Sequence, residues 1–186
     1  MLNFSLQGEL SAYLKENNDL DFNDRLGMSM SVVNGMDYLV RQHYIHRDLA
    51  ARNCLVRPNK SVVISFLSLC EDTHKEDYHM LNGVPVPLRW LSPESMNEEK
   101  YTEKSDVWSF GVTVWEIFTG GDRPRPYNAF SDEDVLNGVP LDLRLTKPKV
   151  CPEELFYIVS ECWDNSPDAR PTFSELKKRI GGVNVE

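Results

Sequence analysis

The most informative stretch of the sequence is IHRDLAARNCLV, which runs from Ile45 to Val56. Apolar residues at both ends of this stretch flank a short polar run that holds a carboxylate, a guanidinium and an amide, at Asp48, Arg52 and Asn53. A carboxylate can accept a proton from a hydroxyl group, and an amide oxygen can bind a hard cation. The stretch is therefore a candidate catalytic loop.

The order H-R-D-L-x-x-x-N, from His46 to Asn53, resembles the catalytic loop of protein kinases, and the A-A-R inside it resembles the tyrosine-kinase version. The resemblance implies that Asp48 is the base and that Arg52 orients the substrate hydroxyl. It also implies that Asn53 is the residue that binds the metal and nucleotide. His46 and Arg47 are expected to have structural roles.

Composition sets limits on the class of protein. With 186 residues and 41% hydrophobic residues, the chain is expected to form one soluble domain or most of one. Its net charge of −9 argues against nucleic acid or an anionic membrane as the main partner. The four cysteines lack Cys-x-x-Cys spacing, which indicates reduced thiols in a cytosolic compartment. No apolar run is long enough for direct membrane insertion of this chain.

The resemblance predicts a mainly α fold, the large C-terminal lobe of a protein kinase, with a short β-hairpin at the catalytic loop. Residues 1–186 are expected to form this lobe alone, with a hinge remnant at 1–7 and helices and the catalytic loop at 8–60. A degenerate metal motif and an activation segment are expected at 61–94, and a helical subdomain at 95–182. The small N-terminal lobe, with its glycine-rich loop and strand lysine, is expected upstream of Met1 and is missing from this sequence.

The metal-binding motif departs from the family pattern. In active relatives the acid of Asp-Phe-Gly lies thirteen residues after the catalytic-loop asparagine, and the same count from Asn53 reaches the triplet Phe66, Leu67 and Ser68. The acid and the glycine are both replaced. Glu71 or Asp72 could serve as the ligand only if the loop were strongly distorted. Loss of the metal is expected to lower the rate by about a thousandfold or more.

The residues from Glu71 to Gly83 resemble an activation segment, in which Tyr78 lies where tyrosine kinases carry autophosphorylation sites. Either Tyr78 is phosphorylated or it packs at the surface of a loop. A phosphorylated Tyr78 could pair with Arg47 through charge-assisted hydrogen bonds. The following P-L-R-W, which ends at Trp90, resembles the segment that receives residues flanking a substrate tyrosine. A structural, strand-like segment is the simpler interpretation of it.

Two long-range contacts follow from the resemblance. Glu94, in the Ser92-Pro93-Glu94 that resembles Ala-Pro-Glu, is expected to pair with Arg170, and Ser92 is expected to cap the helix after it. Asp106 begins a helix that is apolar nearly all round and therefore belongs inside the domain. A buried carboxylate needs donors, and the resemblance implies that Asp106 accepts hydrogen bonds from the backbone of the catalytic loop.

Several helix starts can be predicted from capping residues. Asn23 is expected to cap the helix that leads into the catalytic loop, with Phe22 placed as a hydrophobic staple. Ser131 and Thr172 are expected to cap two later helices, the second in the capping-box sequence T-F-S-E.

Within the kinases, the sequence looks closest to the receptor pseudokinases of the off-track and colon-carcinoma-kinase class. These also replace Asp-Phe-Gly and also run an acidic-Tyr-His sequence into P-L-R-W. The likeness implies a cytoplasmic part of a single-pass plasma-membrane receptor in Wnt-linked signalling. Its expected partners are signalling proteins, the missing N-terminal lobe and Wnt-pathway receptors.

Three functional hypotheses remain open. The first is a non-enzymatic signalling module for which no cofactor is expected. The second is an active tyrosine kinase that uses ATP and Mg²⁺, with Asp48 as base and a non-standard acid such as Asp72 beside Asn53. The third is an incomplete gene model of a receptor tyrosine kinase, which the DNA upstream of Met1 would reveal.

Overall fold

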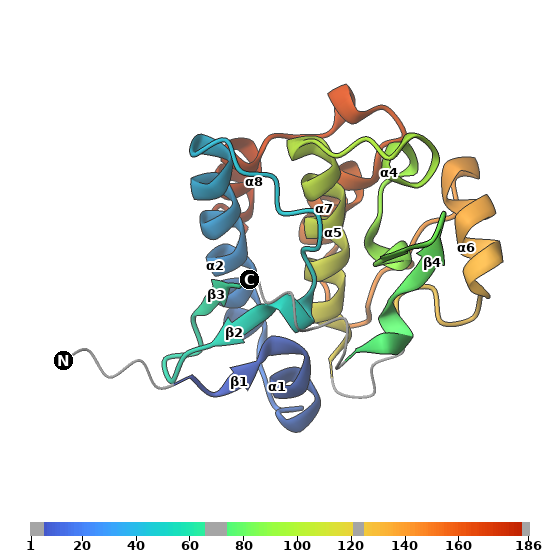
Figure 1. Cartoon of the computed structure of the whole chain (residues 1–186). Coiled ribbons are helices and arrows are strands. Elements are labelled where there is room, and N and C mark those ends of the chain that lie inside the picture. The colour runs from blue at the N-terminus through green and yellow to red at the C-terminus, as the bar shows by residue number, and fades with distance from the viewer. Residues whose placement is uncertain (1–5, 66–73, 121–124, 184–186) are drawn as a thin grey trace.

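The computed structural model describes residues 6–65, 74–120 and 125–183 (Figure 1). The predicted degenerate motif Phe66, Leu67 and Ser68 lies outside the described residues, as do Glu71 and Asp72. The catalytic loop, Tyr78 and the predicted long-range pairs lie within them.

The fold is mainly helical, as the sequence predicts. Four of its helices, α2, α5, α7 and α8, stand side by side, while α6 lies at the opposite edge from α2 (Figure 1). The helices are α1 Leu10–Glu16, α2 Phe22–Arg41, α4 Pro93–Glu98, α5 Glu103–Thr119, α6 Asp132–Gly138, α7 Glu153–Ser160 and α8 Phe173–Ile180.

Within the described residues, short strands form two small antiparallel sheets, and one of them continues directly from the catalytic loop. A three-stranded antiparallel sheet has the order β1 Gly8–Glu9, β2 Cys54–Val56 and β3 Val62–Ile64. Because β2 begins directly after Asn53, the β2–β3 hairpin fixes the end of the catalytic loop, as predicted. A second hairpin, β4 His79–Leu81 and β5 Val84–Val86, follows Tyr78.

The β4–β5 hairpin was not expected from the sequence, although its turn carried a signal. Asn82 and Gly83 link the two strands, and both have positive φ, at 51° and 81°. An Asn-Gly pair is the preferred sequence of a tight hairpin turn, because both residues tolerate this conformation. The next segment, predicted to be strand-like, is instead a 3₁₀ turn over Leu88–Trp90.

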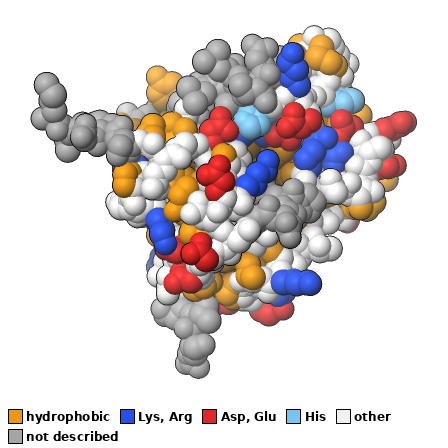
Figure 2. All heavy atoms as spheres, turned by 90° about the horizontal axis from the view of Figure 1, so that it is seen from below, with side chains coloured by type: hydrophobic (Ala, Val, Ile, Leu, Met, Phe, Trp, Pro, Cys, Tyr) orange, Lys and Arg blue, Asp and Glu red, His pale blue; other side chains and the backbone are white. Residues whose placement is uncertain are grey.

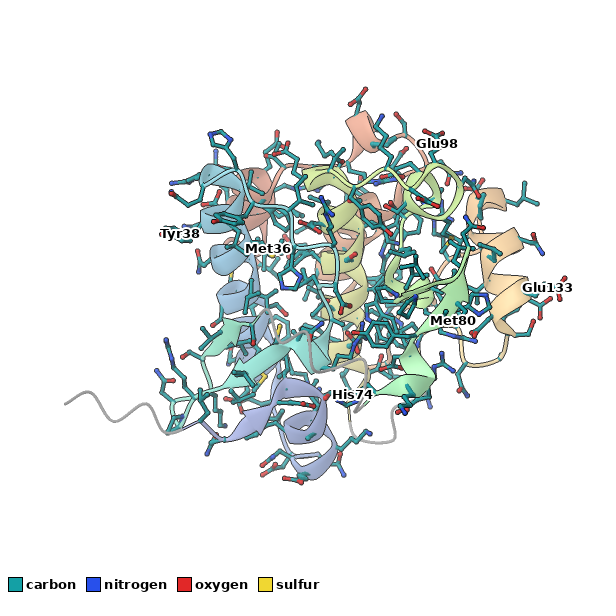
Figure 3. The ribbon with its side chains drawn as sticks, in the orientation of Figure 1. Met36, Tyr38, His74, Met80, Glu98 and Glu133 are labelled. Carbon is teal, nitrogen blue, oxygen red and sulfur yellow. The ribbon has the colours of Figure 1, made fainter. Side chains whose placement is uncertain are left out.

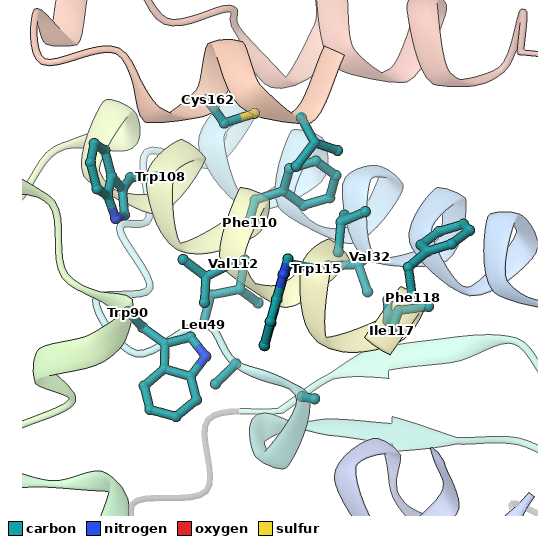
Figure 4. Close-up of a cluster of buried hydrophobic side chains, with 14 of the residues drawn as sticks. Val32, Leu49, Trp90, Trp108, Phe110, Val112, Trp115, Ile117, Phe118 and Cys162 are labelled. Atoms are coloured by element: carbon teal, nitrogen blue, oxygen red, sulfur yellow. The ribbon is translucent and has the colours of Figure 1, made fainter. Parts of the chain in front are cut away.

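Helix α5 lies at the centre of the core (Figure 4). Fourteen consecutive residues of this helix are buried, which explains why its sequence is apolar on all sides. The residues on its faces include Trp108, Phe110 and Ile117, each fully buried. Polar groups on such a helix cannot reach water, so Asp106 and Glu116 must find partners inside the protein.

The capping predictions are partly right. The caps at Ser131 and Thr172 are confirmed, and each forms a capping box with the residue three positions later. The prediction that Asn23 caps α2 is wrong: the N-cap is Asp21, whose side chain accepts a hydrogen bond from the backbone N–H of Asp24 at 2.8 Å. Phe22 is thus the first helical residue, and its ring packs against Phe118.

On the described part of the face seen from below, acidic and basic side chains are interspersed with apolar ones (Figure 2). In the described ranges, no helix combines the length and the apolar character needed to span a bilayer.

Candidate functional site

The start of the catalytic loop is held by a buried carboxylate. The backbone N–H groups of His46 and Arg47 donate to the two oxygens of Asp106, at 2.7 and 2.9 Å. Burial raises the pKa of Asp106 to about 6, although the two backbone hydrogen bonds favour its ionised form. The predicted contact between Asp106 and the loop is therefore confirmed.

The side chains of His46 and Arg47 point to different neighbours. A ring nitrogen of His46 lies 3.1 Å from the backbone oxygen of Ser65, at the end of the β2–β3 hairpin. Burial lowers the pKa of His46. The guanidinium of Arg47 lies 5.6 Å from the ring centre of Tyr101. The pairing of Arg47 with a phosphorylated Tyr78 stays a prediction.

At the centre of the loop, Asp48 is bound by two groups of the same chain. One of its oxygens pairs with the guanidinium of Arg52. The other accepts a hydrogen bond from the hydroxyl of Tyr78 at 2.5 Å. The Nε of Arg52 also donates to this hydroxyl, at 3.3 Å. The phenol of Tyr78 therefore occupies both polar groups to which a kinase would bind a substrate hydroxyl.

The guanidinium of Arg52 contacts two aromatic rings. Its distance to the ring centre is 4.8 Å for Tyr78 and 4.3 Å for Trp90. We call Asp48, Arg52, Tyr78 and Trp90 the Tyr78 cluster. Cation–π contacts of this kind are strongest where water is excluded, and the side chain of Arg52 is only 2% exposed.

Electrostatics keep Arg52 charged and Tyr78 neutral at neutral pH. Burial by itself would lower the pKa of Arg52, but Asp48 and Tyr78 outweigh it and raise that pKa. Burial raises the pKa of Tyr78 to about 12; the nearby Arg52 opposes this effect and the hydrogen bond to Asp48 adds to it. Tyr78 is therefore protonated at neutral pH and can donate to Asp48.

Asn53 lies where the resemblance predicts a ligand for a cation, but it provides only one neutral oxygen. Its amide nitrogen donates to the backbone oxygen of Asp48 at 2.7 Å, while its buried amide oxygen has no hydrogen-bond partner among the described residues. This oxygen suits a metal ion. However, a hard dication usually needs carboxylate ligands as well, and the described residues contain no group of three acidic, His or Cys side chains able to hold a metal. The described residues therefore do not make a complete magnesium site.

Glu94 and Arg170 form a buried ion pair, as predicted, which we call the scaffold pair. The guanidinium of Arg170 contacts both oxygens of Glu94, at 2.7 and 2.8 Å. Ser92 lies at the N-cap of α4, but the prediction that its side chain caps the helix is wrong. Its hydroxyl is instead within hydrogen-bond distance of the Ser95 hydroxyl, 2.9 Å away.

The segment around Tyr78 is tied to its surroundings by charged contacts that the sequence did not predict. Asp77 lies 3.6 Å from Arg52 and 3.5 Å from Arg125. His79 lies 3.4 Å from Asp132, at the start of α6. Ahead of Asp77, His74 lies 2.9 Å from Glu9, near α1 (Figure 3).

The comparison with known proteins agrees with this geometry. The family described as protein tyrosine and serine/threonine kinase matches residues 1–180. The chain belongs to this family. The helical fold of the structure is thus that of the large kinase lobe, with the β2–β3 hairpin at the catalytic loop.

Several curated proteins are similar to this kinase chain. "Inactive tyrosine-protein kinase 7" from Gallus gallus is 41% identical over 84% of the chain, and its human counterpart is 39% identical over 90%. The human "Proto-oncogene tyrosine-protein kinase ROS" is 42% identical over 84%. The chain spans only 15%, 16% and 7% of these three relatives, respectively.

Proposed function

We propose that this chain is a catalytically impaired tyrosine-kinase lobe that acts as a protein-interaction module in receptor signalling. The observation that supports it most directly is the hydrogen bond from Tyr78 to Asp48. With Arg52 bound to the same two residues, the groups that would activate a substrate hydroxyl are already in use.

The energetic argument has two parts. A hydrogen bond to a charged group contributes about 1.5–3 kcal/mol. A substrate would have to displace Tyr78 from Asp48 before reacting, and this cost would lower activity by roughly tenfold or more. The sequence adds a second barrier, because Phe66 stands where the metal-binding acid is expected. Absence of the metal would lower the rate by about a further thousandfold.

The names of the relatives support the proposal that the chain is catalytically impaired. Two of them carry the word "inactive" in their names, whereas the relative named ROS is called a tyrosine-protein kinase. By resemblance, we place the chain on the cytoplasmic side of a single-pass receptor, with signalling proteins and Wnt-pathway receptors as partners.

One observation favours the alternative of an active kinase that uses ATP and Mg²⁺. Asp48, Arg52 and Asn53 are all in place, and within the part of the chain that the structure describes the amide oxygen of Asn53 has no hydrogen-bond partner. Under this alternative, Tyr78 must leave Asp48 before a substrate binds. An acid such as Asp72, which lies outside the described residues, must then complete the metal site.

The test is phosphate transfer by the full-length product of the gene that encodes this chain. We expect no Mg²⁺-dependent transfer from ATP to a tyrosine peptide, either in the wild type or in Tyr78→Phe, which frees Asp48. We also expect no rise in thermal stability with ATP and Mg²⁺. Transfer that appears in either protein and disappears when Asp48→Asn is added would establish the active-kinase alternative.

A further inference from the structure

Helix α5 carries a second buried carboxylate that the kinase resemblance did not single out. Glu116 is 1% exposed and lies ten residues after Asp106 on the same helix. One of its oxygens accepts hydrogen bonds from the backbone N–H of Ala51, at 2.8 Å, and from the indole N–H of Trp90, at 3.0 Å. Glu116 thus connects the helix to two separate segments of the site.

The first connection fixes the end of the catalytic loop from which Arg52 projects. Asp106 holds the loop at His46 and Arg47, and Glu116 holds it at Ala51. Ten residues of α-helix span about 15 Å, and a rigid helix keeps this separation constant. Ala51 begins the 3₁₀ turn Ala51–Asn53, so the bond from its N–H to Glu116 restrains the backbone next to Arg52.

The second connection fixes the ring on which Arg52 rests. Trp90 lies beside α5, near Leu49 (Figure 4). Because the carboxylate of Glu116 holds its indole N–H, the ring is kept in the orientation that places it 4.3 Å from the guanidinium of Arg52. A second aromatic ring in contact with this guanidinium is that of Tyr78, whose centre lies 4.8 Å away.

We infer that Glu116 is a positioning residue for the Tyr78 cluster. By holding the backbone at Ala51 and the indole of Trp90 with one oxygen, it sets the guanidinium of Arg52 where Tyr78 can stack on it and reach Asp48. The inference rests on the proposed function, because it explains how the bond between Tyr78 and Asp48 is maintained. It also gives α5 a role beyond packing, since two of its acids determine the geometry of the loop.

The experiment measures how fast Tyr78 is phosphorylated by an added soluble tyrosine kinase with ATP and Mg²⁺, in the 186-residue chain. Tyr157, which is 65% exposed on α7, serves as the internal reference. In the wild type we expect Tyr78 to react much more slowly than Tyr157. Glu116→Gln replaces the charged acceptor by a neutral one, and the weakening of its hydrogen bonds should raise the relative rate at Tyr78 by about tenfold.

A double-mutant cycle separates positioning from general loosening. Trp90→Phe keeps an aromatic ring beneath Arg52 but removes the N–H that Glu116 binds. If one carboxylate oxygen acts through both contacts, Glu116→Gln and Trp90→Phe should each speed the reaction at Tyr78, and the double variant should be less than multiplicatively faster. Multiplicative effects, or no effect of either substitution on a protected Tyr78, would overturn the inference.

Indole N–H exchange and the reactivity of Tyr157 separate a change at the Tyr78 cluster from unfolding of the whole chain. The indole N–H of Trp90 should exchange faster with solvent in Glu116→Gln, while that of Trp115, which donates to the backbone oxygen of Thr146, should be unchanged. If a variant unfolds, both tyrosines react faster and Trp90→Phe alone decides the inference. If Tyr78 already reacts as fast as Tyr157 in the wild type, the proposed function fails, independently of Glu116.

Discussion

The scaffold pair and the Tyr78 cluster both contain a buried ion pair between an arginine and a carboxylate, but the two lie in different kinds of structure. In both, a guanidinium is almost fully buried and binds a carboxylate, with the side chains of Arg170 and Arg52 at 0% and 2% exposure. Glu94 belongs to α4, and Arg170 also donates to the backbone of Lys104 in α5. The scaffold pair therefore braces α4 and the start of α5 against the segment that precedes α8.

The Tyr78 cluster differs because its members lie in loops and 3₁₀ turns, and Tyr78 comes from a segment outside the catalytic loop. Tyr78 lies between a short 3₁₀ turn, Lys75–Asp77, and the β4–β5 hairpin, and its side chain is about half buried. A fully buried ion pair is costly to break, whereas the phenol of a half-buried tyrosine on a loop can be exchanged for another hydroxyl. The comparison teaches that burial and position in the fold, rather than type of contact, determine whether another group could displace one of the partners.

The largest effect is expected when the scaffold pair is broken. Arg170→Ala leaves the carboxylate of Glu94 buried without its partner, which should lower the free energy of unfolding by about 3–5 kcal/mol. The measurement is urea denaturation. The matched control is Arg179→Ala, because Arg179 pairs with Glu161 at the surface and should contribute about 1 kcal/mol or less. Equal losses in the two variants would contradict the role given to the scaffold pair.

A somewhat smaller loss is expected at the start of the catalytic loop. Asp106→Ala removes the acceptor for two backbone N–H groups and should cost about 3 kcal/mol. Hydrogen exchange measures the result directly, since the amides of His46 and Arg47 should lose their protection while amides in α8 keep theirs. Protection that survives the substitution would show that another group holds the loop.

The contacts of the scaffold could be predicted from the sequence because burial leaves few choices. Asp106 lies in the first turn of α5, a helix that is apolar on nearly every side beyond that point. Its carboxylate therefore had to find donors within the core. Glu94 likewise needed a cation, and the resemblance pointed to Arg170. In these places, hydrophobic pattern and the cost of an unpaired charge determine the partner.

The Tyr78 cluster could not be predicted in the same way. Tyr78 was expected either at a loop surface or, once phosphorylated, near Arg47, whereas the structure places it on Asp48 and Arg52. Nothing local in the sequence fixes the path of a loop that begins and ends on different elements. The Asn-Gly turn after it was the available signal, because a tight hairpin shortens the reach of the segment.

The acid in the middle of α5 was also missed. The charge of Glu116 is visible in the sequence, but its two partners lie 65 and 26 residues away, in segments whose placement depends on the whole fold. A charged residue between apolar neighbours, as Glu116 is between Trp115 and Ile117, is nevertheless a signal. It predicts that some donor enters the core at that level of the helix.

Removing the hydroxyl of Tyr78 should have a modest effect on stability. Tyr78→Phe keeps the ring on Arg52 and loses the hydrogen bond to Asp48, and because the site is half buried the cost should be about 1.5 kcal/mol, at the low end for a bond to a charged group. Urea denaturation measures it, with Tyr157→Phe as the control that should change little. A loss as large as that of Arg170→Ala would place Tyr78 among the structural residues.

The smallest expected effect concerns pH and again separates the two regions. Burial alone would raise the pKa of Glu94, but the bond to Arg170 outweighs it and lowers that pKa below its usual value of 4.5. Because the unfolded chain then binds the proton more readily, the stabilisation is present above pH 4.5 and is lost as the pH falls through the folded pKa. One proton changes stability by at most about 1.4 kcal/mol per pH unit.

The measurement that isolates this effect is the difference in unfolding free energy between the wild type and Glu94→Gln, followed from pH 6 to pH 3.5. The difference should be constant above about pH 5 and should shrink below it. Asp106 titrates with the opposite sign, because its pKa is raised to about 6, but it is present in both proteins and cancels. The same comparison between wild type and Tyr78→Phe should be flat in this range, since the phenol, whose pKa is about 12, stays protonated throughout. A slope in that second comparison would contradict this prediction, because it would show that the stabilisation from the Tyr78 hydroxyl depends on a group that titrates between pH 3.5 and pH 6.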